Sequence, residues 1–248
     1  MLRKRIIPIV LLDGFSVLKT INFSRRRNLG SPITVMRTYN TRNVDELILL
    51  DIDASNSGRS IDKFTLLDIT KECFMPLSVG GGISTIKDIE DLLSVGADKV
   101  VLNTAALKDP QFINSAANRF GSQCIIISID VIKTNDKYLV YNKNCEDLEL
   151  ELTDWLLQVE RQGAGEILIN SVDLDGSLSG GDSALAELAA SVVNIPVIYC
   201  GGISTPKNAA DIAALSVSAV AAASIFHFTE HTPEECRQAL SIEGVPVR

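Results

Sequence analysis

Short apolar runs rich in β-branched residues alternate along the chain with amphipathic stretches of about ten to fifteen residues. This alternation is typical of βα units around a parallel sheet, in which buried strands are separated by helices. Eight runs are predicted to be strands: Arg5–Val10, Glu46–Asp51, Leu77–Gly80, Lys99–Leu102, Cys124–Asp130, Glu166–Asn170, Val197–Cys200 and Ala219–Ala222. Eight such units in 248 residues predict a single TIM barrel, (β/α)8, of the α/β class.

The chain also repeats itself at an offset of 120 residues. The sequence Gly-Gly-Ile-Ser-Thr occurs at residues 81–85 and again at 201–205, in each case after a predicted strand. The same offset places Leu49–Asp53 on Ile169–Asp173. We therefore expect one domain over residues 1–248, built from two half-barrels of about 1–120 and 121–248.

Composition and charge narrow the class of protein. The net charge of −8 and the lack of a basic stripe argue against nucleic acid as a partner. Apolar runs are too short to cross a membrane, and the apolar start of the chain ends at Asp13–Gly14 without the cleavage pattern of a signal peptide. Five cysteines without a C-x-x-C pair indicate reduced thiols, so we expect a cytoplasmic protein. With only two histidines, we expect neither a metal site nor a cofactor.

The repeated glycines are candidates for phosphate binding. In this fold the active site lies at the carboxyl ends of the strands, where glycine lets backbone N–H groups approach an anion. Each half offers a glycine pair and, after its next strand, a pair of small residues: Gly81, Gly82, Asn103 and Thr104 in one half, and Gly201, Gly202, Ala223 and Ser224 in the other. Two such sites would bind a substrate with phosphates at both ends, or a nucleotide-linked substrate. The alternative is that the glycines only form tight βα turns.

Several longer stretches are similar to one enzyme family. They include DELILLDIDAS (45–55), PLSVGGGI (76–83), GADKVVLNTAAL (96–107) and GAGEILINSVDLDG (163–176). In these stretches the chain resembles the HisF family, the cyclase subunits of imidazole glycerol phosphate synthase. The resemblance implies a heterodimer with a HisH-like glutaminase, which docks on the bottom of the barrel and supplies ammonia through the barrel interior.

The same resemblance assigns roles to charged residues at the bottom. The family gates its ammonia passage with a ring of four charges, which match Arg5, Glu46, Lys99 and Glu166 of this sequence. Asp98 matches a contact to the glutaminase. Unpaired charges are costly in an apolar core, so we expect the four to pair with one another. A ring that only stabilises the barrel is the alternative.

At the top of the barrel the match to the family is incomplete. The family uses two aspartates as general acid and base; the second matches Asp130, but Leu11 stands where the first is expected. Asp13 lies two residues further on and is the alternative carboxylate. The substrate-binding residues of the family match Lys19, on the loop after the first strand, together with Asp51, Asp175 and Gly176.

The segment Ile7–Leu12 resembles a branch of the family found with surface-polysaccharide genes. That branch implies a subunit that pairs with a HisH-like glutaminase and supplies ammonia to a sugar amidotransferase, for amidation of a nucleotide-activated sugar. Two alternatives stay open. One is an ordinary cyclase of histidine biosynthesis, which forms imidazole glycerol phosphate and the aminoimidazole carboxamide ribotide. The other is a barrel that activates its glutaminase without chemistry of its own.

Overall fold

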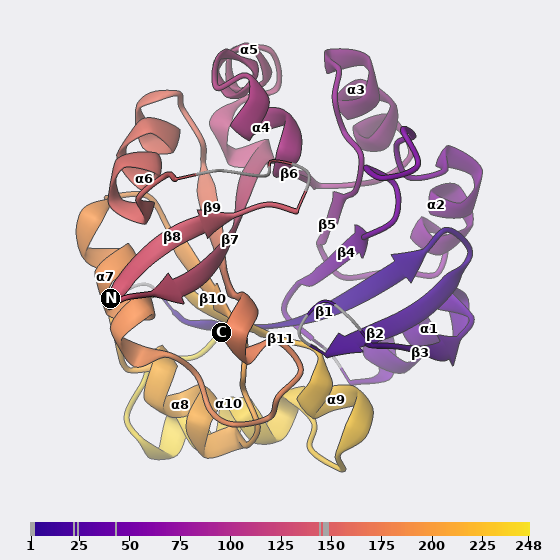
Figure 1. The fold of residues 1–248 in the computed structure, drawn as a ribbon. Coiled ribbons are helices and arrows are strands. Elements are labelled where there is room, and N and C mark those ends of the chain that lie inside the picture. Colours follow the sequence, from indigo (N-terminus) through magenta and orange to yellow (C-terminus); the bar gives the residue numbers. More distant parts are fainter. Residues whose placement is uncertain (1–2, 22, 24, 43, 144, 146–148) are drawn as a thin grey trace.

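A closed barrel of parallel strands forms the centre of the protein (Figure 1). The computed structural model describes residues 3–21, 23, 25–42, 44–143, 145 and 149–248. Strand β1 pairs in parallel with both β4 and β11, which closes the sheet. The barrel strands, in spatial order, are β1 (Arg5–Asp13), β4 (Leu47–Asp51), β5 (Leu77–Gly80), β6 (Lys99–Leu102), β7 (Ile125–Thr134), β9 (Glu166–Ser171), β10 (Val197–Cys200) and β11 (Ala219–Ala222). The predicted (β/α)8 barrel and its eight strands are confirmed, with small shifts at several ends.

Two strands extend beyond the barrel into hairpins that the sequence analysis did not predict. Strand β1 pairs antiparallel with β2 (Ser16–Ile21), which pairs with β3 (Arg25–Gly30). Strand β7 pairs antiparallel with β8 (Lys137–Tyr141). Figure 1 shows these hairpins on opposite sides of the barrel mouth. They therefore supply side chains that lie above the carboxyl ends of the strands.

Helices cover the outside of the barrel (Figure 1). Several begin at a residue whose side-chain oxygen accepts a backbone N–H, as at Asp62, Thr85, Asp182, Thr205 and Thr232. The helices are α1 (Pro32–Thr41), α2 (Lys63–Thr70), α3 (Ile86–Ser94), α4 (Thr104–Lys108), α5 (Gln111–Phe120), α6 (Leu152–Arg161), α7 (Ser183–Val192), α8 (Pro206–Ala213), α9 (Ser224–Phe228) and α10 (Pro233–Ile242), with short 3₁₀ turns η1 (Ser122–Cys124) and η2 (Val172–Leu174). In the part of the chain described above, none of these helices combines the length and apolar character needed to span a bilayer.

Strand alternation divides the core into two clusters. Along β1, Ile6, Val10 and Leu12 pack outward against the helices, while Ile7 and Ile9 pack inside the barrel. The inner cluster continues on the other strands with Ile48, Val101, Ile126, Leu168, Ile198, Cys200, Ala219 and Ala221. These side chains fill the interior between the bottom of the barrel and its mouth.

Candidate active site

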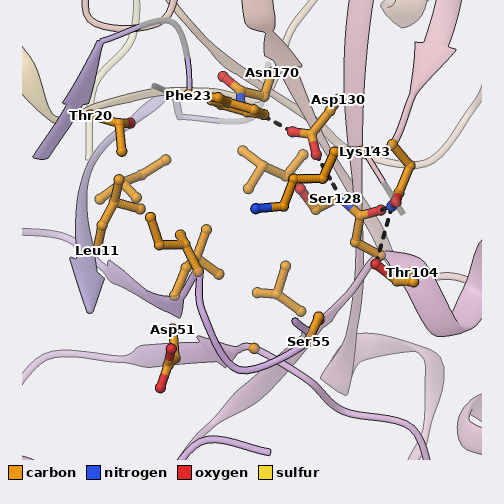
Figure 2. Close-up of a pocket in the computed structure, with 18 of the residues that line it drawn as sticks. Leu11, Thr20, Phe23, Asp51, Ser55, Thr104, Ser128, Asp130, Lys143 and Asn170 are labelled. Carbon is orange, nitrogen blue, oxygen red and sulfur yellow. Dashed lines mark hydrogen bonds between the residues drawn. The ribbon is translucent and has the colours of Figure 1, made fainter. Parts of the chain in front are cut away.

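A cavity of about 220 Å³ opens at the carboxyl ends of the strands, beneath the two hairpins (Figure 2). Phe23 and Tyr141, which line it, contact each other across the mouth, with ring centroids 6.4 Å apart. Of the predicted site residues, these line the cavity: Leu11, Lys19, Asp51, Gly81, Gly82, Asn103, Thr104, Asp130, Asp175 and Ala223. The structure thus gathers at one place residues that are far apart in the sequence.

Leu11 and Asp130 occupy equivalent positions in the two halves of the barrel. Leu11 pairs with Leu50 of the next strand, and the following residue of β1 pairs with Asp51. In the second half Asp130 pairs with Asn170, and the following residue of β7 pairs with Ser171. The register therefore places an aliphatic side chain in the first half where the second half has a carboxylate.

The asymmetry extends to neighbouring strands. Asp130 lies between Asn103 and Asn170, whose side-chain amides donate to its two carboxylate oxygens over 2.9 and 3.1 Å. The residue at the place of Asn103 in the other half is Ala223, at the offset of 120. Leu50 takes the place of Asn170. The cavity therefore has a polar half around Asp130 and an apolar half around Leu11, visible on opposite sides of Figure 2.

Burial controls the acidity of Asp130. Loss of solvation raises the pKa of its carboxyl to about 6, even though the amides of Asn170 and Asn103 favour the ionised form; the negative charge of Asp175 raises it further. A carboxyl with this pKa gains and loses protons near neutral pH, which suits a general acid or base. Asn142 supports the arrangement by donating to Asn103 Oδ1 and Thr104 Oγ1, each over 3.1 Å.

The alternative carboxylate, Asp13, is not part of this cavity. It is the exposed last residue of β1 and pairs with Ser16 in the hairpin. Alternation would direct it to the same side as Leu11, but β1 has by then left the barrel wall. It is Leu11, and not Asp13, that faces the cavity from this strand.

Lys19 lies in strand β2, and not in the loop where the sequence analysis expected it. Its buried ammonium is 3.0 Å from Asp175 Oδ1 and also donates to the carbonyl of Thr20. Thr20 Oγ1 donates to the other oxygen of Asp175 over 2.9 Å. Gly176 is required beside them, because a Cβ there would lie 2.5 Å from the Thr20 carbonyl oxygen. These contacts fasten the β1–β2 hairpin to the loop after β9.

Asp51 is buried and paired. Its carboxylate accepts hydrogen bonds from the Arg59 guanidinium over 2.6 Å and from the backbone N–H groups of Asp53 and Ala54 over 3.1 Å each. All three donor groups come from the loop after β4. Asp51 therefore fixes this loop at the edge of the cavity while still lining it.

The two glycine pairs have a structural role in their own turns. A Cβ on Gly82 would lie 1.8 Å from the Arg59 carbonyl oxygen, and a Cβ on Gly202 would lie 2.1 Å from that of Gly180. Both glycines also have positive φ, at +63° and +77°. The hydroxyls that follow act in part as helix caps, since Thr85 accepts from the N–H of the third helical residue and Thr205 does the same. Tight turns therefore account for the glycines by themselves, and phosphate binding stays a prediction.

A smaller recess of about 20 Å³ adjoins the main cavity. Its lining includes the second set of predicted anion-binding residues, Gly201, Gly202, Ala223 and Ser224, together with the predicted substrate-binding residue Gly176. The hydroxyl of Ser224 is buried without a hydrogen-bond partner among the described residues. Cys200 and the Lys19–Asp175 pair line both spaces, so the two predicted anion sites lie at one continuous mouth.

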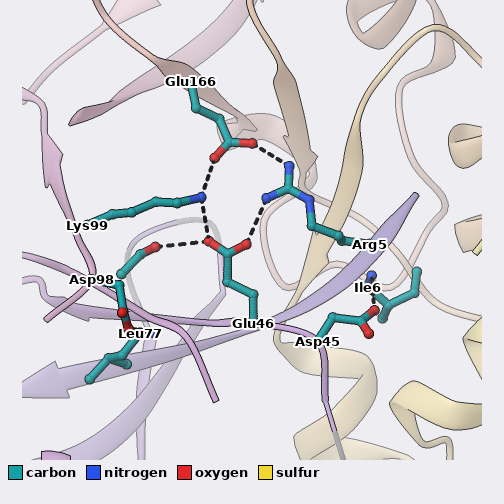
Figure 3. Close-up of polar contacts among 9 residues, drawn as sticks. Arg5, Ile6, Asp45, Glu46, Leu77, Asp98, Lys99 and Glu166 are labelled. Carbon is teal, nitrogen blue, oxygen red and sulfur yellow. Dashed lines mark hydrogen bonds and ion pairs between the residues drawn. The ribbon is translucent and has the colours of Figure 1, made fainter. Parts of the chain in front are cut away.

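At the opposite end of the barrel the four predicted gate residues form a closed ring (Figure 3). Arg5 contacts both Glu46, over 2.7 Å, and Glu166; Lys99 contacts the same two carboxylates over 3.0 and 2.9 Å. Burial alone would raise the pKa of Glu46, but the cations of Arg5 and Lys99 together lower it below its usual value. Strand alternation explains the ring, because these residues stand two positions before the inward-facing Ile7, Ile48, Val101 and Leu168.

Asp98 lies beside this ring on the bottom surface. It is exposed, and its carboxylate accepts the backbone N–H of Leu77 over 2.8 Å. That bond occupies one oxygen and leaves the side chain at the surface. A partner contact there stays a prediction.

The cavity residues that sequence reasoning missed include Phe23, Tyr141, Asn142, Lys143 and Asn170. The repeat carried a signal for Asn170, since the offset of 120 places it on Leu50. The others belong to the hairpins or follow them, and no strand was predicted there. Across the described ranges, no group of three or more His, Cys, Asp or Glu residues has the arrangement of a metal site.

Known proteins are similar to this chain over most or all of its length. The sequence profile of the family described as "Histidine biosynthesis protein" matches residues 5–232. A protein of Campylobacter jejuni with the provisional name imidazole glycerol phosphate synthase subunit hisF2 is 46% identical, over 100% of this chain and 99% of the relative. Proteins named imidazole glycerol phosphate synthase subunit HisF from Dictyoglomus thermophilum and Helicobacter hepaticus are 42% and 40% identical, with the same coverage.

Proposed function

Because the chain belongs to the HisF branch of the histidine biosynthesis protein family, we propose that it is the ammonia-handling subunit of a glutamine amidotransferase complex that amidates a nucleotide-activated sugar. Its partners in this proposal are a HisH-like glutaminase at the bottom of the barrel and a sugar amidotransferase. The observation that carries the proposal is the aliphatic Leu11 at the position equivalent to Asp130.

The consequence of Leu11 is chemical. A cyclase that relies on two carboxyl groups loses one proton-transfer partner when an aliphatic side chain replaces it, which removes a factor of about 10² to 10⁴ in rate. The polar half keeps Asp130 with its raised pKa and both supporting amides. This combination suits a subunit that still binds and handles ammonia but no longer closes an imidazole ring.

In this proposal neutral ammonia crosses the apolar interior of the barrel from the bottom to the mouth. In this proposal the ring of Arg5, Glu46, Lys99 and Glu166 is the gate at the bottom, beside Asp98 at the glutaminase interface. Above it the interior is apolar. An uncharged ammonia molecule loses little on entering such an interior, whereas an ammonium ion loses its hydration at high cost.

The top of this passage offers acceptors for N–H groups. The amide nitrogen of Asn170 must face Asp130, because a carboxylate accepts hydrogen bonds. Its carbonyl oxygen is consequently left buried without a partner among the described residues. A buried acceptor of this kind fits an N–H donor such as ammonia. Asp130 can then take up a proton from nitrogen and release it.

The ordinary cyclase is the second candidate. It is favoured by the names of relatives at 42% and 40% identity, which are HisF subunits of imidazole glycerol phosphate synthase. Asp130, the two glycine pairs and the charged ring are equally compatible with it. The two candidates differ in whether the carboxyl of Asp130 alone is enough for the cyclase reaction.

The test is turnover of the phosphoribulosyl formimino intermediate of histidine biosynthesis with ammonium salt. We expect no imidazole glycerol phosphate from the unsubstituted protein and measurable product from Leu11→Asp, since the variant restores the second carboxyl at the equivalent position. Leu11→Asn is the matched control, because it has the same shape without an acid. Turnover by the unsubstituted protein at rates comparable with the variant would identify the ordinary cyclase and refute the proposal.

A further inference from the structure

Among the described residues that line the cavity, one cationic side chain has no carboxylate partner. Five charged side chains line the cavity in the described part of the chain: Lys19, Asp51, Asp130, Lys143 and Asp175. Lys19 is paired with Asp175, and Asp51 with Arg59 outside the lining. Asp130 has both oxygens bound by amides. The remaining charge is the ammonium of Lys143, for which no described carboxylate lies within ion-pair distance.

The position of Lys143 is set by its neighbours. The preceding residue, Asn142, is buried and donates to Asn103 and Thr104 on the polar half of the cavity. Tyr141 ends β8 against Phe23 of the opposite hairpin. Lys143 directly follows these two residues and is exposed, and Figure 2 shows its ammonium directed into the cavity. A flexible ammonium in this place can reach a ligand bound beside Asp130.

We propose that Lys143 is a specificity-determining residue that pairs with an anionic oxygen group of the substrate, a carboxylate or a phosphate, in the polar half of the cavity. The uncharged part of the same substrate lies against the apolar half formed by Leu11, Leu50 and Ala223. This inference rests on the proposed function only in taking the cavity as the substrate site. It adds a third anion contact to the two that are predicted at the glycine pairs.

The experiment compares two sugars that differ in one group. Glucose 1-phosphate and glucuronate 1-phosphate share the ring and the phosphate, and only the second has a carboxylate on the sugar. Their dissociation constants are measured by calorimetry at millimolar ligand, without glutaminase or ammonia. A charge-assisted contact predicts that Lys143→Gln weakens binding about tenfold. Loss for the glucuronate alone identifies a carboxylate contact, and equal loss for both sugars identifies a phosphate contact.

Two further variants serve as controls for this experiment. Lys143→Arg keeps the charge and is expected to bind within about threefold of the unsubstituted protein. Lys133→Gln removes a lysine of the same hairpin whose ammonium lies 5.4 Å from the ring centroid of Tyr138, outside the cavity lining, and is expected to change neither constant. Unchanged binding in Lys143→Gln, equal weakening in Lys133→Gln, or no binding of either sugar would overturn the proposal. None of these outcomes depends on whether amidation occurs.

Discussion

Burial of Asp130 should make the protein less stable at neutral pH than it would be without this carboxyl. The pKa is about 6 in the folded protein against 3.8 for an unperturbed aspartate. Between these values the folded state binds more protons than the unfolded state, so the free energy of unfolding falls as the pH rises through this window. A difference of about two units corresponds to about 3 kcal/mol, lost in full above pH 7.

Asp130→Asn removes this titration and tests the estimate. Asparagine has one carbonyl oxygen, so one of the donors from Asn103 and Asn170 loses its acceptor, at a cost of about 1–3 kcal/mol. That cost does not depend on pH, whereas the gain does. The stability of the variant relative to the unsubstituted protein should therefore be about 1.5 kcal/mol more favourable at pH 8 than at pH 5.

Urea unfolding at the two pH values measures this difference, with the fluorescence of Trp155, the single tryptophan, as the signal. Asp136→Asn is the matched control: this residue is exposed in the turn of the β7–β8 hairpin, with a positive φ that asparagine also adopts. This variant makes the same change of residue type at a carboxyl that is exposed to solvent. If Asp130→Asn has equal effects at pH 5 and pH 8, the reasoning about burial is wrong.

Two further predictions concern the ring and the glycine turns. Lys99→Met leaves the two carboxylates of the ring with one cation, and we expect a loss of about 2 kcal/mol in the free energy of unfolding, less than for a fully buried pair because the lysine side chain is 24% exposed; an unchanged urea midpoint would show that the ring does not stabilise the barrel. Gly82→Ala places a Cβ 1.8 Å from a backbone carbonyl oxygen and should cost more than about 3 kcal/mol, whereas Gly58→Ala, with a similar φ of +62° and nothing within 4 Å, should cost about 1 kcal/mol. Equal midpoints for the two glycine variants in thermal unfolding would contradict the close approach.

The barrel was predictable because its strands are continuously apolar and its helices are amphipathic. A strand that is buried on both faces is apolar along its whole length, whereas a helix that is buried on one face is amphipathic. The hairpins were not predictable in this way, because Ser16–Ile21 and Lys137–Tyr141 mix polar and apolar residues and resemble loops. Their pairing is decided by the strands β1 and β7, which continue past the barrel wall. Lys19 was therefore expected in a loop although it lies in a strand.

The candidate site, like the fold, could be predicted from the sequence only in part. Leu11 and Asp130 were recognised from the resemblance to the HisF family, and the register of the structure makes their positions equivalent. The pairing of Asp51 with Arg59 could not be derived, since it depends on how the loop after β4 folds back. Lys143 was not recognised because a lone lysine in a polar segment carries no periodic signal.

The Asp130→Asn variant also separates an enzyme from a barrel that only activates its glutaminase. Ionisation of this buried carboxyl costs about 3 kcal/mol, whereas the equivalent position in the other half of the barrel holds the aliphatic Leu11 and carries no such cost. Groups with strongly shifted pKa values gather at functional sites because chemistry needs them. If Asp130 handles protons, the variant should be more stable relative to the unsubstituted protein at pH 8 than at pH 5 and should lose amidation by the complex. If the barrel is only an activator, the same shift in stability should come with full activity of the complex.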